Sequence, residues 1–306
     1  MKNINWSELG FGYFKTDYNV RCEYKDGKWG ELYATEDVNM NIHMASTCLH
    51  YGQEVFEGLK AFRGADGKVR LFRVEENAKR MINSGEYLKM AVPSVELFTK
   101  ACIEAVKLNA DYIPPYGSGA SLYLRPMLIG VGPQVGVKPS ADYLFAVFVT
   151  PVGPYYKDGF NCIKVIIDYD HDRAAPKGTG HVKVGGNYAA SLDSGEIAHQ
   201  KGFASVIFLD PATKQYIDEC SAANFFGIRD GKYITPDSHS VLPSITNKSL
   251  RQIAEDLGLK VEQRKVGVEE LPTFSEAGCC GTAAVISPIG SVYDPKTDKT
   301  IVYGDG

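Results

Sequence analysis

The sequence predicts two α/β domains, each built on an α+β-type mixed sheet. First, the 306 residues amount to about two domains of ~150 residues. Second, strand-like and helix-like segments are interspersed without the strict alternation of a doubly wound nucleotide-binding fold. Third, a segment rich in Pro and Gly at 150–159 separates two strand-like runs. We therefore expect a smaller domain at 1–152, a linker at 153–162 and a larger domain at 163–306.

Apolar periodicity places the main elements within these domains. Apolar alternation and β-branched residues predict strands at 68–72, 120–130, 143–149, 163–167, 204–209, 223–228 and 283–287. Helical periodicity is clearest at 75–91, 95–109, 188–200 and 247–257. Ser94 immediately precedes the second of these helices and is its expected N-cap. Between two such domains, a crevice is a favoured place for a ligand.

Composition excludes several classes of protein. The net charge of −4 gives no electrostatic reason to expect nucleic acid or an anionic membrane as a partner. No apolar run approaches the ~18 residues of a membrane span, and the N-terminus resembles neither a signal peptide nor a transit peptide. Seven scattered cysteines indicate reduced thiols, with Cys279–Cys280 as buried structure, so we expect a soluble cytoplasmic protein. The six histidines lack metal-ligand spacing, and no metal site is expected.

The most unusual segment is KGTGHVKVGGNY, at 177–188. Glycines surround Lys183 and a helix pattern follows at once, so backbone N–H groups could approach an anionic ligand here. The spacing is not that of a P-loop, because Lys183 precedes its glycine pair. A mobile surface loop with a solvated lysine is the competing interpretation, and this segment alone does not decide between the two.

A second segment, YIDECSAANFF at 216–226, places Glu219 and Asn224 in a small, largely apolar run. A carboxylate in such surroundings needs a partner, and a protonated pyridine nitrogen is one group that would hold it ionised. The alternative is an ordinary hairpin turn in which Asp218 and Glu219 meet Lys214.

Two further segments could contact a phosphate. Arg73 ends the strand-like run VRLFR, and a strand-end arginine can bind phosphate with two hydrogen bonds; a solvated or ion-paired arginine is the commoner situation. The turn LPSITNKSL opens a helix, and the N–H groups of Ile245 and Thr246 could hold a phosphate there. Simple capping by Ser244 or Thr246 is the alternative.

Taken together, five blocks of sequence resemble the branched-chain amino acid aminotransferases, which are pyridoxal 5'-phosphate (PLP) enzymes of fold type IV. The blocks are YGQEVFEGLKAF (51–62), VRLFR (69–73), SLYLRP (121–126), GTGHVKVGGNY (178–188) and LPSIT (242–246). The resemblance runs in order over nearly the whole chain, and five blocks in register are highly specific. It implies a two-domain fold with PLP at the domain interface.

The resemblance also implies a role for each matching residue. Lys183 would be the catalytic lysine that forms the Schiff base, Tyr188 would hydrogen-bond the phenolic oxygen and Glu219 would pair with the pyridine nitrogen. The other cofactor-binding residues would be Arg73, Asn224, Ile245, Thr246 and Thr282. The substrate-binding residues would be Tyr51, Phe56, Tyr123, Arg125, Val137, Tyr155, Thr282 and Ala283. Of these, Tyr51 and Val137 are expected from the partner subunit of a homodimer.

The implied reaction is reversible transfer of the amino group of L-leucine, L-isoleucine or L-valine to 2-oxoglutarate, which gives the branched 2-oxoacid and L-glutamate. An apolar lining suits the branched side chain, and Arg125 suits a terminal carboxylate because a buried carboxylate needs a hydrogen-bonded cation. Without the resemblance, the alternating pattern predicts an ordinary strand in which Tyr123 packs and Arg125 is structural.

Other readings stay open at this point. The same fold and cofactor also serve D-amino acid transaminases and aminodeoxychorismate lyases, and in a non-enzymatic phosphate-binding protein Lys183 would be a counter-ion. Ala284 and Ser287 stand where some relatives have a Cys-x-x-Cys pair, so redox control of that kind is not expected. Relatives usually continue past the position of Gly306 into a final helix, so we expect the C-terminal segment to be incomplete or trimmed.

Overall fold

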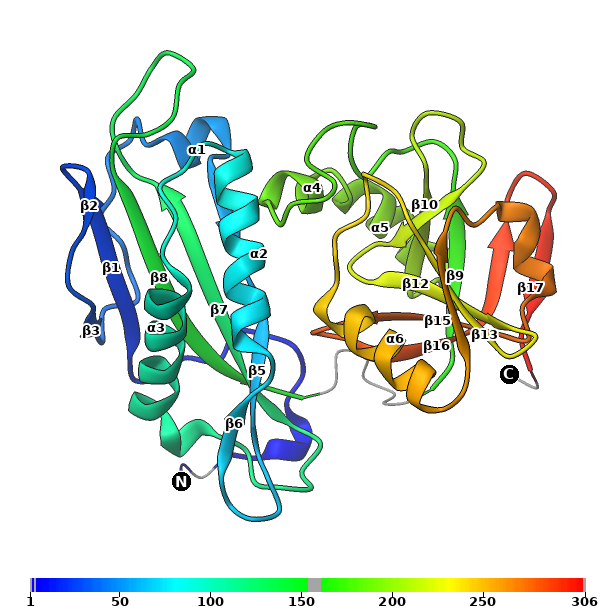
Figure 1. The fold of residues 1–306 in the computed structure, drawn as a ribbon, viewed down its shortest axis with the longest axis horizontal. Helices are drawn as coiled ribbons and strands as arrows, with labels where there is room; N and C mark the ends of the chain where they lie inside the picture. Colours follow the sequence, from blue (N-terminus) through cyan, green and yellow to red (C-terminus); the bar gives the residue numbers. More distant parts are fainter. Residues whose placement is uncertain (1, 3, 154–160, 305–306) are drawn as a thin grey trace. The chain divides into compact units, whose positions relative to one another are not determined.

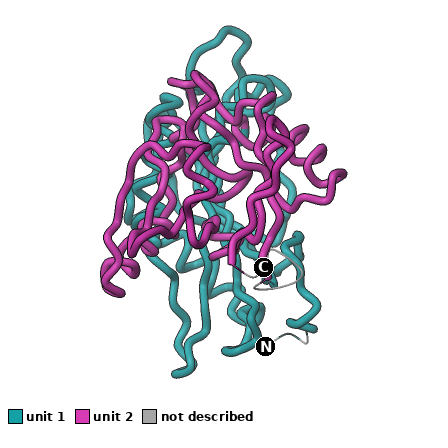
Figure 2. The backbone as a smooth tube through the Cα atoms, turned by 90° about the vertical axis from the view of Figure 1, so that its right-hand side faces the viewer, with its two compact units in different colours: residues 1–157, 183–185 teal, residues 158–182, 186–306 magenta. Residues whose placement is uncertain are grey.

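The computed structural model describes residues 2, 4–153 and 161–304. The chain divides into two compact units (Figure 2): unit 1 comprises residues 1–157 and 183–185, and unit 2 comprises residues 158–182 and 186–306. The linker expected at 153–162 falls mostly on residues outside the described part of the chain.

Lys183 groups with unit 1, whereas the sequence placed it in the second domain. The reason lies in its backbone hydrogen bonds, which join it to unit 1. The Lys183 N–H donates to Ser84 Oγ over 3.0 Å, and the Lys183 carbonyl accepts from the Phe56 N–H over 3.1 Å.

Unit 1 contains an eight-stranded sheet in the order β2-β1-β8-β7-β5-β6, with β3 paired to β1 and β4 to β7 (Figure 1). All of its pairs are antiparallel. The strands are β1 (Asn19–Lys25), β2 (Lys28–Trp29), β3 (Tyr33–Thr35), β4 (Glu54–Phe56), β5 (Leu59–Arg63), β6 (Val69–Leu71), β7 (Ser121–Gly130) and β8 (Tyr143–Val152). The pair β7–β8 runs in unbroken register and is mostly buried, so it forms the centre of this unit.

Helices cover this sheet. They are α1 (Thr47–Tyr51), α2 (Val74–Tyr87) and α3 (Val95–Leu108), with 3-10 turns η1 (Trp6–Glu8) and η2 (Ala110–Tyr112). The predicted N-cap is confirmed, since Ser94 Oγ accepts from the Leu97 N–H over 3.1 Å. Phe98 of α3 stacks on Phe145 of β8 with ring centroids 5.8 Å apart, which fastens α3 to the sheet through an aromatic pair.

A buried ion pair attaches α2 to the segment between β4 and β5. Arg80 of α2 donates from Nε and Nη2 to the two carboxylate oxygens of Glu57, each over 2.8 Å. Asn77 Nδ2 donates to the same carboxylate, also over 2.8 Å. Glu57 is fully buried, and a buried charge of this kind persists only when its lone pairs are satisfied.

Unit 2 contains a nine-stranded mixed sheet in the order β11-β10-β9-β16-β15-β12-β13-β14, with β17 paired to β16. The pairs β9–β10, β9–β16 and β13–β14 are parallel, and the others are antiparallel. The strands are β9 (Ile163–Asp168), β10 (Ser205–Leu209), β11 (Ile217–Cys220), β12 (Asn224–Arg229), β13 (Lys232–Pro236), β14 (Lys260–Arg264), β15 (Glu276–Gly281), β16 (Val285–Asp294) and β17 (Lys299–Val302).

The helical elements of unit 2 are α5 (Leu192–Gln200), α6 (Ile245–Asp256) and η3 (Val268–Thr273), preceded by the short α4 (Gly185–Ala189). Ala198 of α5 packs with Val206 and Phe208 of β10 in a buried cluster. The single helix predicted at 188–200 is wrong, because α4 and α5 are separate. The Tyr188 carbonyl accepts from both the N–H and the hydroxyl of Ser191, which ends the first helix there.

The seven thiols are free and differ in exposure. Cys279 and Cys280 are buried as predicted, Cys22, Cys102 and Cys220 are also buried, Cys48 is half-buried and Cys162 is exposed. Burial raises the pKa of the Cys280 thiol far above its ordinary value. The thiol therefore stays protonated, and a protonated thiol is unreactive. Among the described residues, none of the helices is both long and apolar enough to cross a bilayer.

Candidate active site

Lys183 lies against the ring of Phe56 in unit 1. Its Nζ is 4.7 Å from the centroid of that ring, while its backbone is fixed by Ser84 and by the Phe56 N–H, as described above. The following glycine is also held, because the Gly185 N–H donates to the Glu54 carboxylate. The lysine therefore extends from a backbone that is hydrogen-bonded to unit 1 on both sides of its side chain.

A second cation approaches the same ring. The Arg125 guanidinium is 4.8 Å from the Phe56 centroid, and its Nη2 donates to the Tyr123 hydroxyl over 3.2 Å. Arg125 Nε is buried and has no hydrogen-bond partner among the described residues. Tyr123 lies over Gly58, where any Cβ would overlap its hydroxyl. Phe56, Tyr123, Arg125 and Lys183 thus form one cluster of aromatic and cationic groups in unit 1, which we call the Phe56 cluster.

Glu54 contributes the negative charge next to this cluster. Burial raises the pKa of its carboxyl, and both the Gly185 N–H and the charge of Arg125 oppose that rise. When it is ionised, the Glu54 carboxylate offsets part of the positive charge gathered around Phe56.

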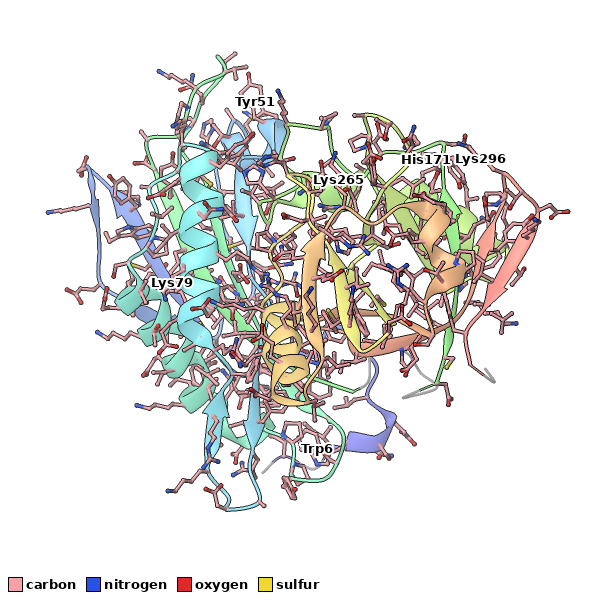
Figure 3. The ribbon with its side chains drawn as sticks, turned by 45° about the vertical axis from the view of Figure 1, so that its right-hand side comes forward. Trp6, Tyr51, Lys79, His171, Lys265 and Lys296 are labelled. Atoms are coloured by element: carbon pink, nitrogen blue, oxygen red, sulfur yellow. The ribbon has the colours of Figure 1, made fainter. Side chains whose placement is uncertain are left out.

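The remaining unit 1 residues predicted for the site lie outside the Phe56 cluster. Arg73 follows β6 by two residues and is the N-terminal flanking residue of α2, in the left-handed conformation (φ 51°). Tyr51, labelled in Figure 3, is 41% exposed and donates to the Val135 carbonyl, and Val137 is 86% exposed. Tyr155 lies outside the described residues.

Glu219 of β11 is the central residue among those predicted for the site in unit 2. It is 4% exposed and forms an ion pair with Arg173. Asn224 Nδ2 donates to its Oε2 over 2.9 Å, and the Leu242 N–H donates to its Oε1 over 3.4 Å. Asp218 and Glu219 belong to β11 of the β10–β11 hairpin, and Lys214 lies in the connection between these strands. Lys214 itself binds Asp172 and the His171 carbonyl.

Asn224 connects Glu219 to a longer chain of buried polar groups. Asn247 Nδ2 donates to Asn224 Oδ1 over 3.3 Å and to Thr235 Oγ1 over 2.9 Å. The Tyr233 hydroxyl donates to Asn247 Oδ1 over 2.8 Å. Because each member has partners, the network fixes the orientation of the Asn224 amide toward the carboxylate.

Helix α6 begins close in sequence to the Leu242 N–H that contacts Glu219. Ser244 Oγ accepts from the Asn247 N–H over 3.2 Å, so Ser244 is the cap, which was one of the alternatives. Ile245 and Thr246 are the first two helical residues, and N–H groups at these positions have no partner within the helix. They are available to an anion regardless of the cap.

Tyr188 and the Thr282–Ala283 pair are half-buried residues of unit 2. Tyr188 belongs to α4, and Thr282–Ala283 lies between β15 and β16. The next strand starts at Val285, whose φ of 58° is unusual for a β-branched residue. The strand predicted at 283–287 therefore begins two residues later and continues as the longer β16.

Two residues that sequence reasoning missed organise unit 2 around these positions. Arg173 is 8% exposed and binds Glu219. Asn187 accepts from Thr179 Oγ1 over 2.6 Å and donates to the Thr179 and Val182 carbonyls, which fixes the loop before Lys183. Neither has a sequence signal of its own, because an arginine or asparagine in a polar loop is ordinarily solvated.

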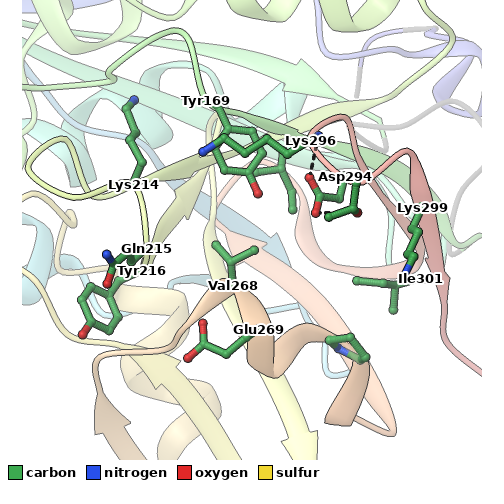
Figure 4. Close-up of a pocket in the computed structure, with 13 residues that line it drawn as sticks. Tyr169, Lys214, Gln215, Tyr216, Val268, Glu269, Asp294, Lys296, Lys299 and Ile301 are labelled. Atoms are coloured by element: carbon green, nitrogen blue, oxygen red, sulfur yellow. Dashed lines mark hydrogen bonds between the residues drawn. The ribbon is translucent and has the colours of Figure 1, made fainter.

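A separate cavity of about 540 Å³ lies in unit 2, lined from β9, η3, β16 and β17 (Figure 4). Lys296 Nζ is 3.8 Å from the Tyr169 ring centroid. Burial, with the nearby Asp294 carboxylate, raises the pKa of Tyr169 to about 12. Of the described residues predicted for the site, none lines this cavity.

The family assignment follows from similarity to known proteins. The model of the class IV amino-transferases matches residues 54–292. The branched-chain-amino-acid aminotransferase of Haemophilus influenzae is 52% identical over 299 residues, with 95% of this chain and 87% of the relative covered. The chain belongs to the branched-chain-amino-acid aminotransferases, within class IV.

Solved structures of the family have the same fold. The Escherichia coli branched-chain amino acid aminotransferase matches with a TM-score of 0.77 at 29% identity, over 95% of this chain and 89% of that one. The branched-chain aminotransferase of the archaeon Thermoproteus uzoniensis, solved with norvaline, matches with a TM-score of 0.76 at 26% identity, over 94% and 90%. The two units of this family member therefore form the predicted two-domain fold of type IV, with mixed and antiparallel sheets.

Proposed function

We propose that this aminotransferase transfers the amino group of L-leucine, L-isoleucine or L-valine to 2-oxoglutarate, with PLP attached to Lys183. The observation that carries the proposal is the Phe56 cluster, in which an anchored lysine and an arginine approach one aromatic ring. Such a reaction requires three groups close together: a reactive amine, an apolar surface for the substrate side chain and a cation for a carboxylate.

The donor and acceptor groups of unit 2 fit the cofactor. An ionised carboxylate offers about four acceptor sites, and Glu219 receives hydrogen bonds from Arg173, Asn224 and the Leu242 N–H. One further donor, such as a protonated pyridine nitrogen, can be accommodated. The free N–H groups of Ile245 and Thr246 suit a phosphate, and we assign Arg73 and Thr282 to the phosphate as well, and Tyr188 to the phenolic oxygen.

When bound, PLP supplies an electron-accepting ring for the bond changes at the substrate's α-carbon. Lys183 Nζ would hold the cofactor, and as a free amine it would move the proton at the substrate Cα as general acid and base. Glu219 would hold the pyridine nitrogen of the cofactor, and its negative charge would favour the protonated form of that nitrogen. The Thr282 and Ala283 amides hold the α-carboxylate.

The Phe56 cluster also accounts for two kinds of substrate. The Phe56 ring offers an apolar surface to a branched side chain. Arg125 offers a guanidinium whose Nε is unpartnered among the described residues, and a carboxylate such as that of 2-oxoglutarate would complete it. The exposed Tyr51 and Val137 would extend the apolar lining for the partner subunit of a homodimer.

An amino-donor panel tests the reaction. We expect L-leucine, L-isoleucine and L-valine to be active with 2-oxoglutarate, and D-alanine to be inactive. Activity with D-alanine and none with L-leucine would favour a D-amino acid transaminase and refute the proposal.

Borohydride reduction followed by peptide mapping tests the cofactor attachment. We expect the pyridoxyl group on Lys183, and its loss in Lys183→Ala together with nearly all turnover. Lys177→Ala is the matched control, since Lys177 is an exposed lysine of the same loop. A pyridoxyl group on any other lysine of the wild-type chain would contradict the assignment.

A further inference from the structure

Arg173 is a buried cation that touches three separate segments of unit 2. Its Nη2 group contacts Glu219 Oε1, donates to the Gly180 carbonyl over 2.8 Å and donates to the Ser240 carbonyl. The residue is 8% exposed, so its charge is largely buried.

Each of the three segments leads to a residue assigned to the cofactor. Gly180 lies three residues before Lys183, Ser240 lies five residues before Ile245, and Glu219 is itself assigned to the ring nitrogen. Close packing reinforces one of these contacts, because a Cβ at Gly180 would overlap the Ser240 backbone. The Arg173 side chain therefore fixes the spacing between three parts of unit 2: the loop before Lys183, the segment before α6 and the Glu219 carboxylate.

The charge of Arg173 matters as much as its hydrogen bonds. Burial raises the pKa of the Glu219 carboxyl, the neighbouring Asp218 adds to that rise, and Arg173 is the strongest opposing influence. The other groups that oppose it, the Leu242 N–H and the Asn224 amide, are uncharged. A buried carboxylate without its cation becomes protonated, and a protonated Glu219 could not stabilise a protonated ring nitrogen.

We propose that Arg173 is a positioning residue of the cofactor site, which keeps Glu219 ionised and ties the Lys183 loop and the segment before α6 to it. The inference rests on the proposed function, in which the partner of Glu219 is the ring nitrogen of PLP. It assigns Arg173 no contact with substrate or with the cofactor.

The first test is a double-mutant cycle on the full chain with its cofactor removed. The variants are Arg173→Gln, Glu219→Gln and the double variant, compared by thermal unfolding midpoint. Each single substitution leaves one buried charge unpaired, whereas the double substitution removes both. We expect the double variant to unfold at a higher temperature than the sum of the two single shifts predicts. Additive shifts would overturn the inference.

The second test measures the cofactor itself. We expect Arg173→Gln to raise the dissociation constant for PLP about ten- to a hundredfold, the range found when residues that orient metal ligands are lost. The pH midpoint of the cofactor's visible absorption should also shift, and Arg173→Lys should restore the midpoint because it restores the charge. Arg229→Gln is the matched control, since Arg229 is a half-buried arginine of unit 2 that pairs with Glu270. An unchanged dissociation constant and midpoint in Arg173→Gln would overturn the inference.

The two proposals fail in distinguishable ways. If wild-type protein carries no pyridoxyl group on Lys183 after reduction, the proposed function is lost whatever the cycle gives. If Lys183 is labelled but Arg173 and Glu219 are energetically independent, only the role of Arg173 is lost.

Discussion

Lys60 is a buried lysine in the sheet of unit 1, and replacing it with methionine should stabilise the protein at neutral pH. It lies in β5 directly opposite Tyr123 of β7 and is 7% exposed. Burial lowers the pKa of its ammonium group from 10.5 to about 8. Methionine keeps an unbranched apolar stem of similar length and removes the charge.

The size of the effect follows from this shift. Between 10.5 and about 8, at about 1.4 kcal/mol per unit, the charged amine destabilises the folded state by about 3 kcal/mol. The full penalty is present below pH 8, where folded and unfolded chains are both protonated. As the pH rises from 8 toward 10.5, the unfolded chain binds more protons than the folded chain, so the free energy of unfolding increases and the penalty disappears.

Urea unfolding from about pH 7 to about pH 10 measures this difference. We expect Lys60→Met to be more stable than the wild type by about 3 kcal/mol at pH 7, with a gap that closes as the pH rises. Lys100→Met is the control, since Lys100 is an exposed lysine of α3 in the same unit, and its effect should be small and independent of pH. The reasoning is refuted if Lys60→Met is less stable at pH 7, or if its gap does not change with pH.

Two further predictions concern unit 1. Arg80→Met should destabilise the protein by about 3–5 kcal/mol in urea unfolding, because Glu57 is left as an unpaired buried charge. Adding Glu57→Gln to this variant should recover much of the lost stability. A loss below about 1 kcal/mol in Arg80→Met would argue against a buried ion pair. Gly58→Ala should displace Tyr123, since its Cβ would overlap the tyrosine hydroxyl, and raise KM for 2-oxoglutarate on the order of tenfold. Gly195→Ala, with nothing within 4 Å of the added Cβ, is the control in steady-state kinetics, and equal KM values for the two variants would count against a role for Tyr123.

The long apolar elements were predictable from sequence because their signals are local. The strands β7 and β8 and the helices α2, α3 and α6 appear within a few residues of their predicted bounds, since periodicity and capping are written in neighbouring residues. The five sequence blocks likewise led to the family, because each pairs unusual residue types at fixed spacing.

The missed elements depend on distant partners. Strand β1 has a mixed sequence, and its stability comes from pairing with β8, more than a hundred residues away. Strand β11 has the sequence IDEC, and its two acidic residues are poor strand formers. The strand tolerates Glu219 because Arg173 and the Asn224 network surround its carboxylate. The grouping of Lys183 with unit 1 has the same origin, in hydrogen bonds to Ser84 and Phe56 that no local pattern encodes.

The differing exposure of the thiols offers a route to site-specific labelling without mutagenesis. Cys162, one residue before β9, is exposed, and the other six are buried or half-buried. A maleimide dye at limiting concentration should therefore attach first at Cys162, because alkylation requires solvent access. The native chain therefore already has an attachment site for a fluorescent reporter at the start of the first strand of unit 2.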